Sequence, residues 1–459
     1  EPGVISGSFD SRKNELKLIA GIRKLVYGGT EVNDFAVNVN SENNALNYRI
    51  SGAAISNSQI RLDNVLLDGK LANNQIVANL SSTSGNNRKL LIRSLLTKEH
   101  GNYKLTIDPN DFFLVNNRWN IAADNSIEFG KQGFRIHNFF IDHNQSSIRV
   151  ASVNDRFNDD LNIAIANFRL DDFSRIVEKD TALVKGTVDG NVLLKRVADS
   201  YGLISDLKVN KLVIHEVPIG NLSLKASRLE PNKFDLNLNL SGSDNNLTAT
   251  GYLVPGEGQN TMHLKTEIQS LSMKTIEAFS MGQISEASGI LSGNILADGA
   301  LTAPDISGEL VFRNVFLKPS FLNSRLELKN ETIQLKNDGV YFQSFTLLDR
   351  NQHAATINGS VQMKQFADLS FALQVNATDF VLFNTTAKDN KEFFGRMVID
   401  SKVNVSGPMS LPGVNGRVKL KKGSSFTFSV PEDQLTTDKG EDVVEFSNPQ
   451  KMNPILSRG

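Results

Sequence analysis

Apolar and polar residues alternate strictly along much of this chain. The clearest case is residues 233–241, where every second residue is apolar: Phe234, Leu236, Leu238 and Leu240. A Gly-Ser-Asp-Asn-Asn cluster typical of turns follows at 242–246, and the alternation then resumes as far as Leu253. Successive side chains of a β-strand point to opposite faces of the sheet. The segment therefore predicts a β-hairpin with one apolar and one polar face.

The same alternation recurs from one end of the chain to the other. It places further apolar residues at Phe35, Val37, Val39, Leu105, Ile121, Ile163, Ile165, Leu222, Leu224, Leu326, Leu328, Phe371, Leu373 and Val375. Turn-forming segments rich in Asn, Gly, Ser and Asp separate these strands. Only residues 171–179 and 272–281 have the spacing of short amphipathic helices, with a third, weaker candidate at 387–395. The chain is therefore predicted to be all-β with two or three short helices.

A motif repeated about a hundred residues apart suggests serial units. Gly186 and Gly289 each begin a Gly-x-x-x-Gly-Asn-[Val/Ile]-Leu sequence, and a degraded copy begins at Gly395. A Gly-Pro-Gly step with equal spacing begins at Gly299 and again at Gly407. The repeats predict an N-terminal segment (1–160), two repeats (161–263 and 264–370), a degraded repeat (371–430) and a flexible polar tail (431–459).

Two architectures satisfy this pattern. Closed β-sandwiches of about 100 residues would each seal their apolar faces, and clear linkers between such bodies are not apparent in the sequence. The alternative is one elongated antiparallel sheet that curls along its length into a U-shaped hydrophobic groove. An apolar surface of that size marks a binding surface. An acyl chain fits it, since a lipid with roughly 30 methylenes gains about 25 kcal/mol by leaving water.

Composition narrows the possible functions. The chain has 49 basic and 50 acidic residues and a net charge of −1, so nucleic acid is not an expected partner. It has no cysteine, which suits an oxidising compartment. The six histidines are scattered, with His137 and His143 the only near pair, and the acidic segment 154–160 lacks the pattern of a calcium loop. No nucleophile elbow, P-loop or zinc-protease motif occurs. We expect no enzymatic activity, no cofactor and no metal site.

Three features of the sequence resemble the TamB family. They are the Gly-x-[Leu/Ile]-x-Gly-x-[Leu/Ile] strands, the segment TAPDISGELVFRN (302–314) and the segment WNIAADNSIEFGKQGFRIHNFFIDHNQSSIRV (119–150). These large AsmA-like proteins belong to the translocation and assembly module of the Gram-negative envelope, and the Asn- and Phe-rich composition resembles Bacteroidetes members. The resemblance implies a β-taco groove in the periplasm and an Omp85-class outer-membrane partner similar to TamA. Because the chain begins with Glu and has no apolar span, we interpret it as a piece whose N-terminal inner-membrane anchor lies outside it.

With this resemblance, the sequence predicts a periplasmic bridge that carries phospholipid acyl chains between the inner and outer membranes. The lipid would lie against the eighteen alternating apolar residues that run from Phe35 to Val375. An alternative function is a scaffold whose sheet edges template outer-membrane proteins by β-augmentation. A carbohydrate-binding solenoid is disfavoured, because its period would be near twenty and because 27 Phe far outnumber the single Trp and six Tyr.

Overall fold

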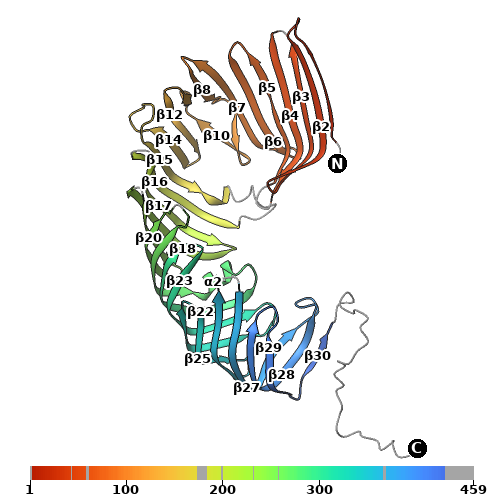
Figure 1. The fold of residues 1–459 in the computed structure, drawn as a ribbon, viewed down its shortest axis with the longest axis vertical. Coiled ribbons are helices and arrows are strands. Elements are labelled where there is room, and N and C mark those ends of the chain that lie inside the picture. The colour runs from red at the N-terminus through yellow and green to blue at the C-terminus, as the bar shows by residue number, and fades with distance from the viewer. Residues whose placement is uncertain are drawn as a thin grey trace, which may run out of the picture.

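A single curled β-sheet makes up almost the whole protein. The computed structural model describes residues 3–429, apart from 43, 58–60, 173–182, 198–199, 231, 257 and 365–367. These described residues form one antiparallel sheet of 30 strands, in which the chain meanders from one end to the other. The sheet bends into an open arc, with the N-terminal strands at one end and the C-terminal strands at the other (Figure 1). No helix in the described part is long and apolar enough to span a membrane.

The N-terminal end of the sheet consists of long strands joined by tight turns. They are β1 (Val4–Asp10), β2 (Glu15–Tyr27), β3 (Thr30–Glu42), β4 (Ala45–Ser56), β5 (Arg61–Ala72), β6 (Gln75–Ser84) and β7 (Asn87–Glu99). Each pairs with the strand that follows it. The turn between β2 and β3 is Gly28-Gly29, and both glycines have positive φ, as the favoured two-residue hairpin turn requires.

The next strands are interrupted midway. They are β8 (Asn102–Ile107), β9 (Phe112–Leu114), β10 (Asn117–Ile121), β11 (Ser126–Gly130), β12 (Gly133–His137), β13 (Phe139–His143) and β14 (Ser146–Ser152). β8 and β9 together take the place of one strand, because both pair with β7. The side chain of Asn125 links the turn between β10 and β11 to the end of β8. It accepts from the Ile107 N–H at 2.9 Å and donates to the Ile107 carbonyl at 2.8 Å. This buried amide therefore satisfies backbone groups that the ladder leaves unpaired.

The central and C-terminal parts continue the meander with longer strands. The central elements are β15 (Leu161–Arg169), β16 (Val184–Val197), β17 (Ser200–Ile214), β18 (Val217–Glu230), β19 (Lys233–Gly242), β20 (Asn245–Val254), β21 (Thr261–Ser272), α2 (Met273–Phe279) and β22 (Ile284–Ala300). The C-terminal elements are β23 (Ala303–Pro319), β24 (Leu326–Lys336), β25 (Gly339–Leu348), β26 (Ala354–Lys364), β27 (Asp368–Thr385), β28 (Phe393–Pro408), β29 (Gly413–Leu420) and β30 (Ser425–Phe428). β29 and β30 both pair with β28.

Repeated β-bulges interrupt the regular pairing of the long strands. On β15, β17, β25 and β27 the register shifts where one residue has a positive φ. The N–H of that residue then donates to a side-chain oxygen on the neighbouring strand. The four bonds are Asn167 to Asp189 (2.8 Å), Lys211 to Asn221 (2.9 Å), Ser344 to Asn358 (2.7 Å) and Asp379 to Asp400 (2.8 Å). A bulge bends and twists its strand, so these bonds fix where the sheet curls.

The repeated glycine motif has a structural basis. The fifth residue of each copy, Gly190 in one and Gly293 in the other, lies in mid-strand with φ of 142° and 145°. A Cβ at Gly190 would lie 2.1 Å from the carbonyl oxygen of Asp206, and one at Gly293 would lie 2.0 Å from that of Glu309. Only glycine accepts both this backbone conformation and this close approach of the neighbouring strand.

The hairpin and one helix expected from the sequence are confirmed. The hairpin is β19–β20, joined by Ser243 and Asp244, which both have positive φ. The expected helix at 272–281 is α2. Residues 170–172 are helical, and the rest of the helix expected at 171–179 lies outside the described residues. The polar tail at 431–459 also lies outside them. The other segment boundaries stay predictions, and two of them, 263/264 and 370/371, fall inside β21 and β27.

The prediction of a third helix at 387–395 is wrong. Residues 386–392 form a turn, and strand β28 begins at 393. The Asp389 carboxylate accepts from the Thr386 N–H and from its hydroxyl, each at 2.8 Å. Such local bonds favour turns over helices, because they occupy donors that a helix would use.

Candidate functional site

The apolar faces of successive strands join into one continuous surface. Directly paired residues of an antiparallel sheet lie on the same face, so a row can be followed from strand to strand. From β10 to β28 one row consists of Ile121, Ile141, Ile148, Ile165, Gly190, Leu207, Leu224, Leu238, Ala249, Thr266, Ile295, Gly308, Leu335, Val340, Val361, Phe371 and Gly407. Thr266 is the only polar residue in this row. With strands about 4.8 Å apart, the row is roughly 75 Å long.

A second row lies two residues away along the same strands and contains no polar residue. It consists of Phe168, Val188, Val209, Leu222, Leu240, Leu247, Ile268, Gly293, Leu310, Ile333, Phe342, Gly359, Leu373, Val405 and Val414. At the N-terminal end, a corresponding row consists of Ala20, Val37, Ile50, Leu67, Leu80 and Ile92. We call the surface formed by these three rows the apolar trough.

The opposite face of the sheet is polar. One of its rows contains, in order along neighbouring strands, Asn191, Asp206, Lys225, Asn237, Thr250 and Lys265. Lys225 and Asp206 form an ion pair at 3.4 Å on this surface. From β16 to β21, therefore, the alternation in the sequence is kept in register from strand to strand.

The structure brings all eighteen sequence-predicted residues onto the trough face. Five belong to the first row and three to the second. Phe35, Val37 and Val39 lie on β3, and Leu105 pairs with Leu96 and Ile127. Ile163, Phe234, Leu236 and Val375 share a strand and face with row members, and Leu326 and Leu328 pair with Leu317 and Val315. Their contact with lipid stays a prediction.

These residues differ in how accessible they are. Ile121, Leu240, Leu326 and Leu328 are buried by other protein side chains, with exposed fractions of 6%, 9%, 6% and 2%. The other fourteen are half-buried. The trough is therefore closed by packing in some places and open in others.

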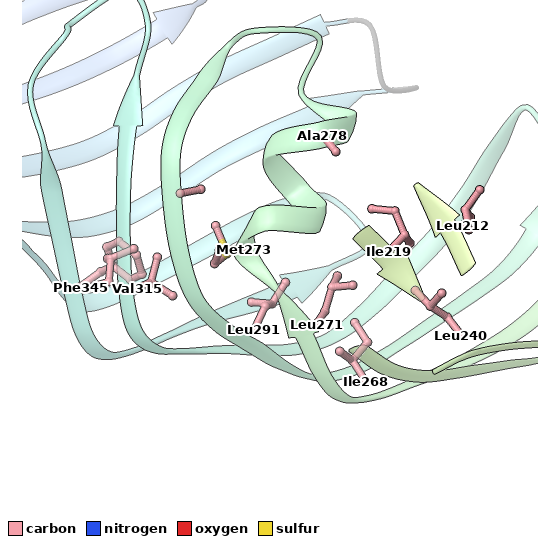
Figure 2. Packing of buried hydrophobic residues seen from close by; sticks show 12 residues of the cluster. Leu212, Ile219, Leu240, Ile268, Leu271, Met273, Ala278, Leu291, Val315 and Phe345 are labelled. Atoms are coloured by element: carbon pink, nitrogen blue, oxygen red, sulfur yellow. The ribbon is translucent and has the colours of Figure 1, made fainter. Parts of the chain in front are cut away.

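Helix α2 closes the trough at its middle. Met273 and Ala278 on the helix are 3% and 7% exposed. They belong to the same cluster as Ile268, Leu291 and Val315 of the sheet. Figure 2 shows these side chains on the inner side of the bent strands, next to the helix. This packed region covers part of the second row, whereas Leu224, Leu238 and Ala249 of the first row lie outside the cluster and stay half-buried.

The helix is fastened to the sheet by one buried amide. Asn245, 3% exposed, donates to the Ile219 carbonyl and to the Thr275 hydroxyl, each at 2.8 Å. Its side-chain oxygen accepts from the Ser272 N–H at 2.8 Å, immediately before the helix begins. Every group in this network has a partner, and buried polar groups are stable only under that condition.

The histidines and the acidic segment considered as possible metal ligands form bonds with other protein groups. His137 contacts Asp155 at 2.9 Å and Asp124 at 3.2 Å, while His143 faces the Arg118 carbonyl at 2.8 Å. The hydrogen bond to Asp155 is the main reason that the pKa of His137 is raised. In the segment 154–160, the side chain of Asn154 bonds to Asp159 and lowers its pKa. Within the described residues, no group of three or more possible ligands could hold a metal ion.

Two features of this region are not evident from the sequence. One is the set of bulge-binding side chains, such as Asp189 and Asp400, which resemble ordinary surface residues in the sequence. The other is an aromatic cluster at the C-terminal end, where Phe383 contacts Phe393 at 4.9 Å and Phe426 at 6.1 Å between ring centroids. The alternating Phe426 and Phe428 are the sequence signal that could have indicated this aromatic cluster.

Comparison with known families accounts for most of the chain. Residues 24–312 match the family model described as TamB, N-terminal domain, and residues 343–457 match the TamB C-terminal domain. This chain belongs to the TamB family. No curated protein and no solved structure matches it.

Membership of the TamB family establishes the broad role of the chain. TamB proteins act in the biogenesis of the bacterial envelope and work with an outer-membrane partner. The open, curled antiparallel sheet agrees with the groove expected for this family. The chain is therefore an envelope protein.

Proposed function

We propose that this TamB protein conducts phospholipid between the inner and outer membranes, with acyl chains lying in the apolar trough. The observation that supports this is the row from Ile121 to Gly407, in which Thr266 is the one polar member. Each methylene kept out of water contributes about 0.8 kcal/mol. A continuous apolar path therefore removes most of the barrier to leaving a bilayer, and no catalytic step is needed.

The half-buried state of the trough residues supports the same proposal. A side chain already sealed in a core cannot contact a ligand, whereas Leu224 and Leu238 still present surface. They are direct partners across β18 and β19. In the periplasm, such surface would be covered by lipid rather than by water.

Charging this pair tests the proposal. The Leu224→Asp/Leu238→Arg variant places two charges in the path and should lower lipid transfer between donor and acceptor vesicles at least tenfold. The matched control is Ser223→Asp/Asn239→Arg, a direct pair on the same two strands but on the polar face. Circular dichroism checks that both variants fold. Unchanged transfer by a folded Leu224→Asp/Leu238→Arg variant would rule out the trough as the path.

A second candidate function, templating of outer-membrane proteins, has its own support. Strand β1 pairs only with β2 in the described part of the chain, and Val4 and Ile5 are 71% and 74% exposed. An open sheet edge can add an incoming strand. In that case, crosslinks from β1 would capture nascent outer-membrane proteins, and the trough charges would leave the capture unchanged.

A further inference from the structure

A basic pocket lies where strands β22, β23, β27 and β28 meet the segments 323–325 and 350–351. It has a volume of about 670 Å³ and is lined by Lys318, Arg325, Arg350, Arg396 and one carboxylate, Glu286. Asparagine and serine side chains complete most of the lining. Four cations around one acid stand out in a chain whose net charge is −1.

The register places this pocket on the polar face. On β28, Arg396 pairs with Asn384, whereas the adjacent Met397 pairs with Phe383. Phe383 belongs to the aromatic cluster of the trough. Because neighbouring residues of a strand point to opposite faces, Arg396 faces away from the trough. The pocket is therefore a separate feature from the proposed lipid path.

The cations come from separate elements and are held in place without neutralising most of them. Lys318 pairs with Glu286 at 2.5 Å. The Arg325 guanidinium stacks over the Phe316 ring at 4.4 Å, and Arg396 donates to the Gly423 carbonyl at 3.1 Å. Among the described residues, no carboxylate oxygen lies within 4.0 Å of the Arg325, Arg350 or Arg396 guanidinium nitrogens.

A buried carboxylate fixes the turn that carries Arg350. Asp349, 1% exposed, accepts from the N–H groups of Asn351 at 2.7 Å, His353 at 2.9 Å and Val381 at 3.0 Å. The turn is thereby joined to strand β27. The Asp349 carboxylate also contacts His353 Nδ1 at 3.3 Å. Asp349 therefore orders the wall of the pocket rather than pairing with the arginines of the pocket.

We propose that this pocket binds a phosphate-bearing anion. Guanidinium groups form paired, charge-assisted hydrogen bonds with phosphate oxygens, and three of them here lack a carboxylate partner. A doubly charged phosphate also relieves the mutual repulsion of the gathered cations. The same chemistry is offered by a lipid phosphate headgroup and by a soluble phosphate, and the two sources are distinguished experimentally.

The test uses the whole 459-residue chain and charge-removing variants. Arg325→Gln/Arg350→Gln removes two exposed guanidinium groups of the pocket. Arg313→Gln/Arg417→Gln removes two exposed guanidinium groups elsewhere on the sheet and is the matched control. Calorimetry with inorganic phosphate and pyrophosphate forms one arm, and flotation with phosphatidylcholine vesicles, with and without phosphatidic acid, forms the other.

The pocket variant should bind its ligand about ten- to a hundredfold more weakly than the wild type, with the control unchanged. A loss confined to calorimetry supports a soluble phosphate, and a loss confined to phosphatidic acid vesicles supports a lipid headgroup. Equal binding by wild type and pocket variant in both arms, or no saturable binding by wild type in either, would overturn the proposal.

Discussion

Replacing Asn245 with alanine should release helix α2 from the sheet. The substitution deletes the acceptor of the Ser272 N–H and the donor to the Ile219 carbonyl, two groups with no other partner in that network. Asn245 is 3% exposed and Ser272 8%, so water replaces the lost bonds poorly. The helix has only seven residues, too few to be stable without its contacts to the sheet.

The size of the effect follows from the two unpaired groups. Each buried group left unsatisfied costs about 1–3 kcal/mol. We therefore expect the free energy of opening α2 to fall by about 2–6 kcal/mol. Since 1.4 kcal/mol corresponds to a factor of ten, amide exchange in the helix should accelerate by about 30-fold at the lower bound and about 20,000-fold at the upper bound.

Hydrogen exchange read by mass spectrometry is the appropriate assay. A long serial sheet unfolds in parts, so a single global free energy of unfolding is not well defined. Peptides covering 273–279 report the helix, and peptides from β6 and β7, distant in the sheet, serve as an internal reference. Asn245→Asp keeps the acceptor for Ser272 but places a buried charge opposite the Ile219 carbonyl, so the helix should exchange at least as fast as in Asn245→Ala.

The control is the neighbouring residue. Asn246→Ala removes a solvent-exposed bond to Gln269 and should leave helix exchange within about threefold of wild type. If Asn245→Ala also leaves it within that range, the amide does not hold the helix. The view of α2 as a fastened closure of the trough would then be wrong.

Three further results are expected. Gly293→Val should destabilise its part of the sheet by at least about 2 kcal/mol, through strain at positive φ and a clash with the Glu309 carbonyl. Local proteolysis measures this loss, and Gly21→Val, whose added Cβ would meet nothing within 4 Å, is the control. Asn358→Ala should speed exchange at Ser344, because it removes the acceptor of that N–H, whereas Asn358→Asp should restore protection. The raised pKa of His137 means that its ion pairs stabilise the fold below its ordinary pKa and lose that effect as pH rises through the folded-state pKa. The difference in local stability between wild type and His137→Gln, measured by hydrogen exchange of peptides covering β12, should thus be larger near pH 5.5 than near pH 8.5, at under about 1 kcal/mol; an equal difference at both pH values would contradict this reasoning.

The sequence alone determined the strands and their two faces, whereas closed sandwiches and one open sheet both satisfied its pattern. Strict alternation around Phe234, Leu236 and Leu238 could be read correctly because a strand has a side-chain period of two, whatever lies beside it. The turn at Ser243 and Asp244 and the short helix near 273 are also local in origin. Such features depend on neighbours a few residues away, and a sequence displays those directly.

Only the tertiary structure decided which parts of the apolar face are open. Leu238 and Leu240 look alike in the sequence, yet one stays half-buried and the other is 9% exposed in the cluster beside α2. Likewise, nothing near Asp379 announces that Asp400, on the next strand, will hold its bulge. The path of the helix and the bends of the sheet arise from contacts between residues distant in the chain. Burial is a property of those contacts, so residue type and spacing could not predict it.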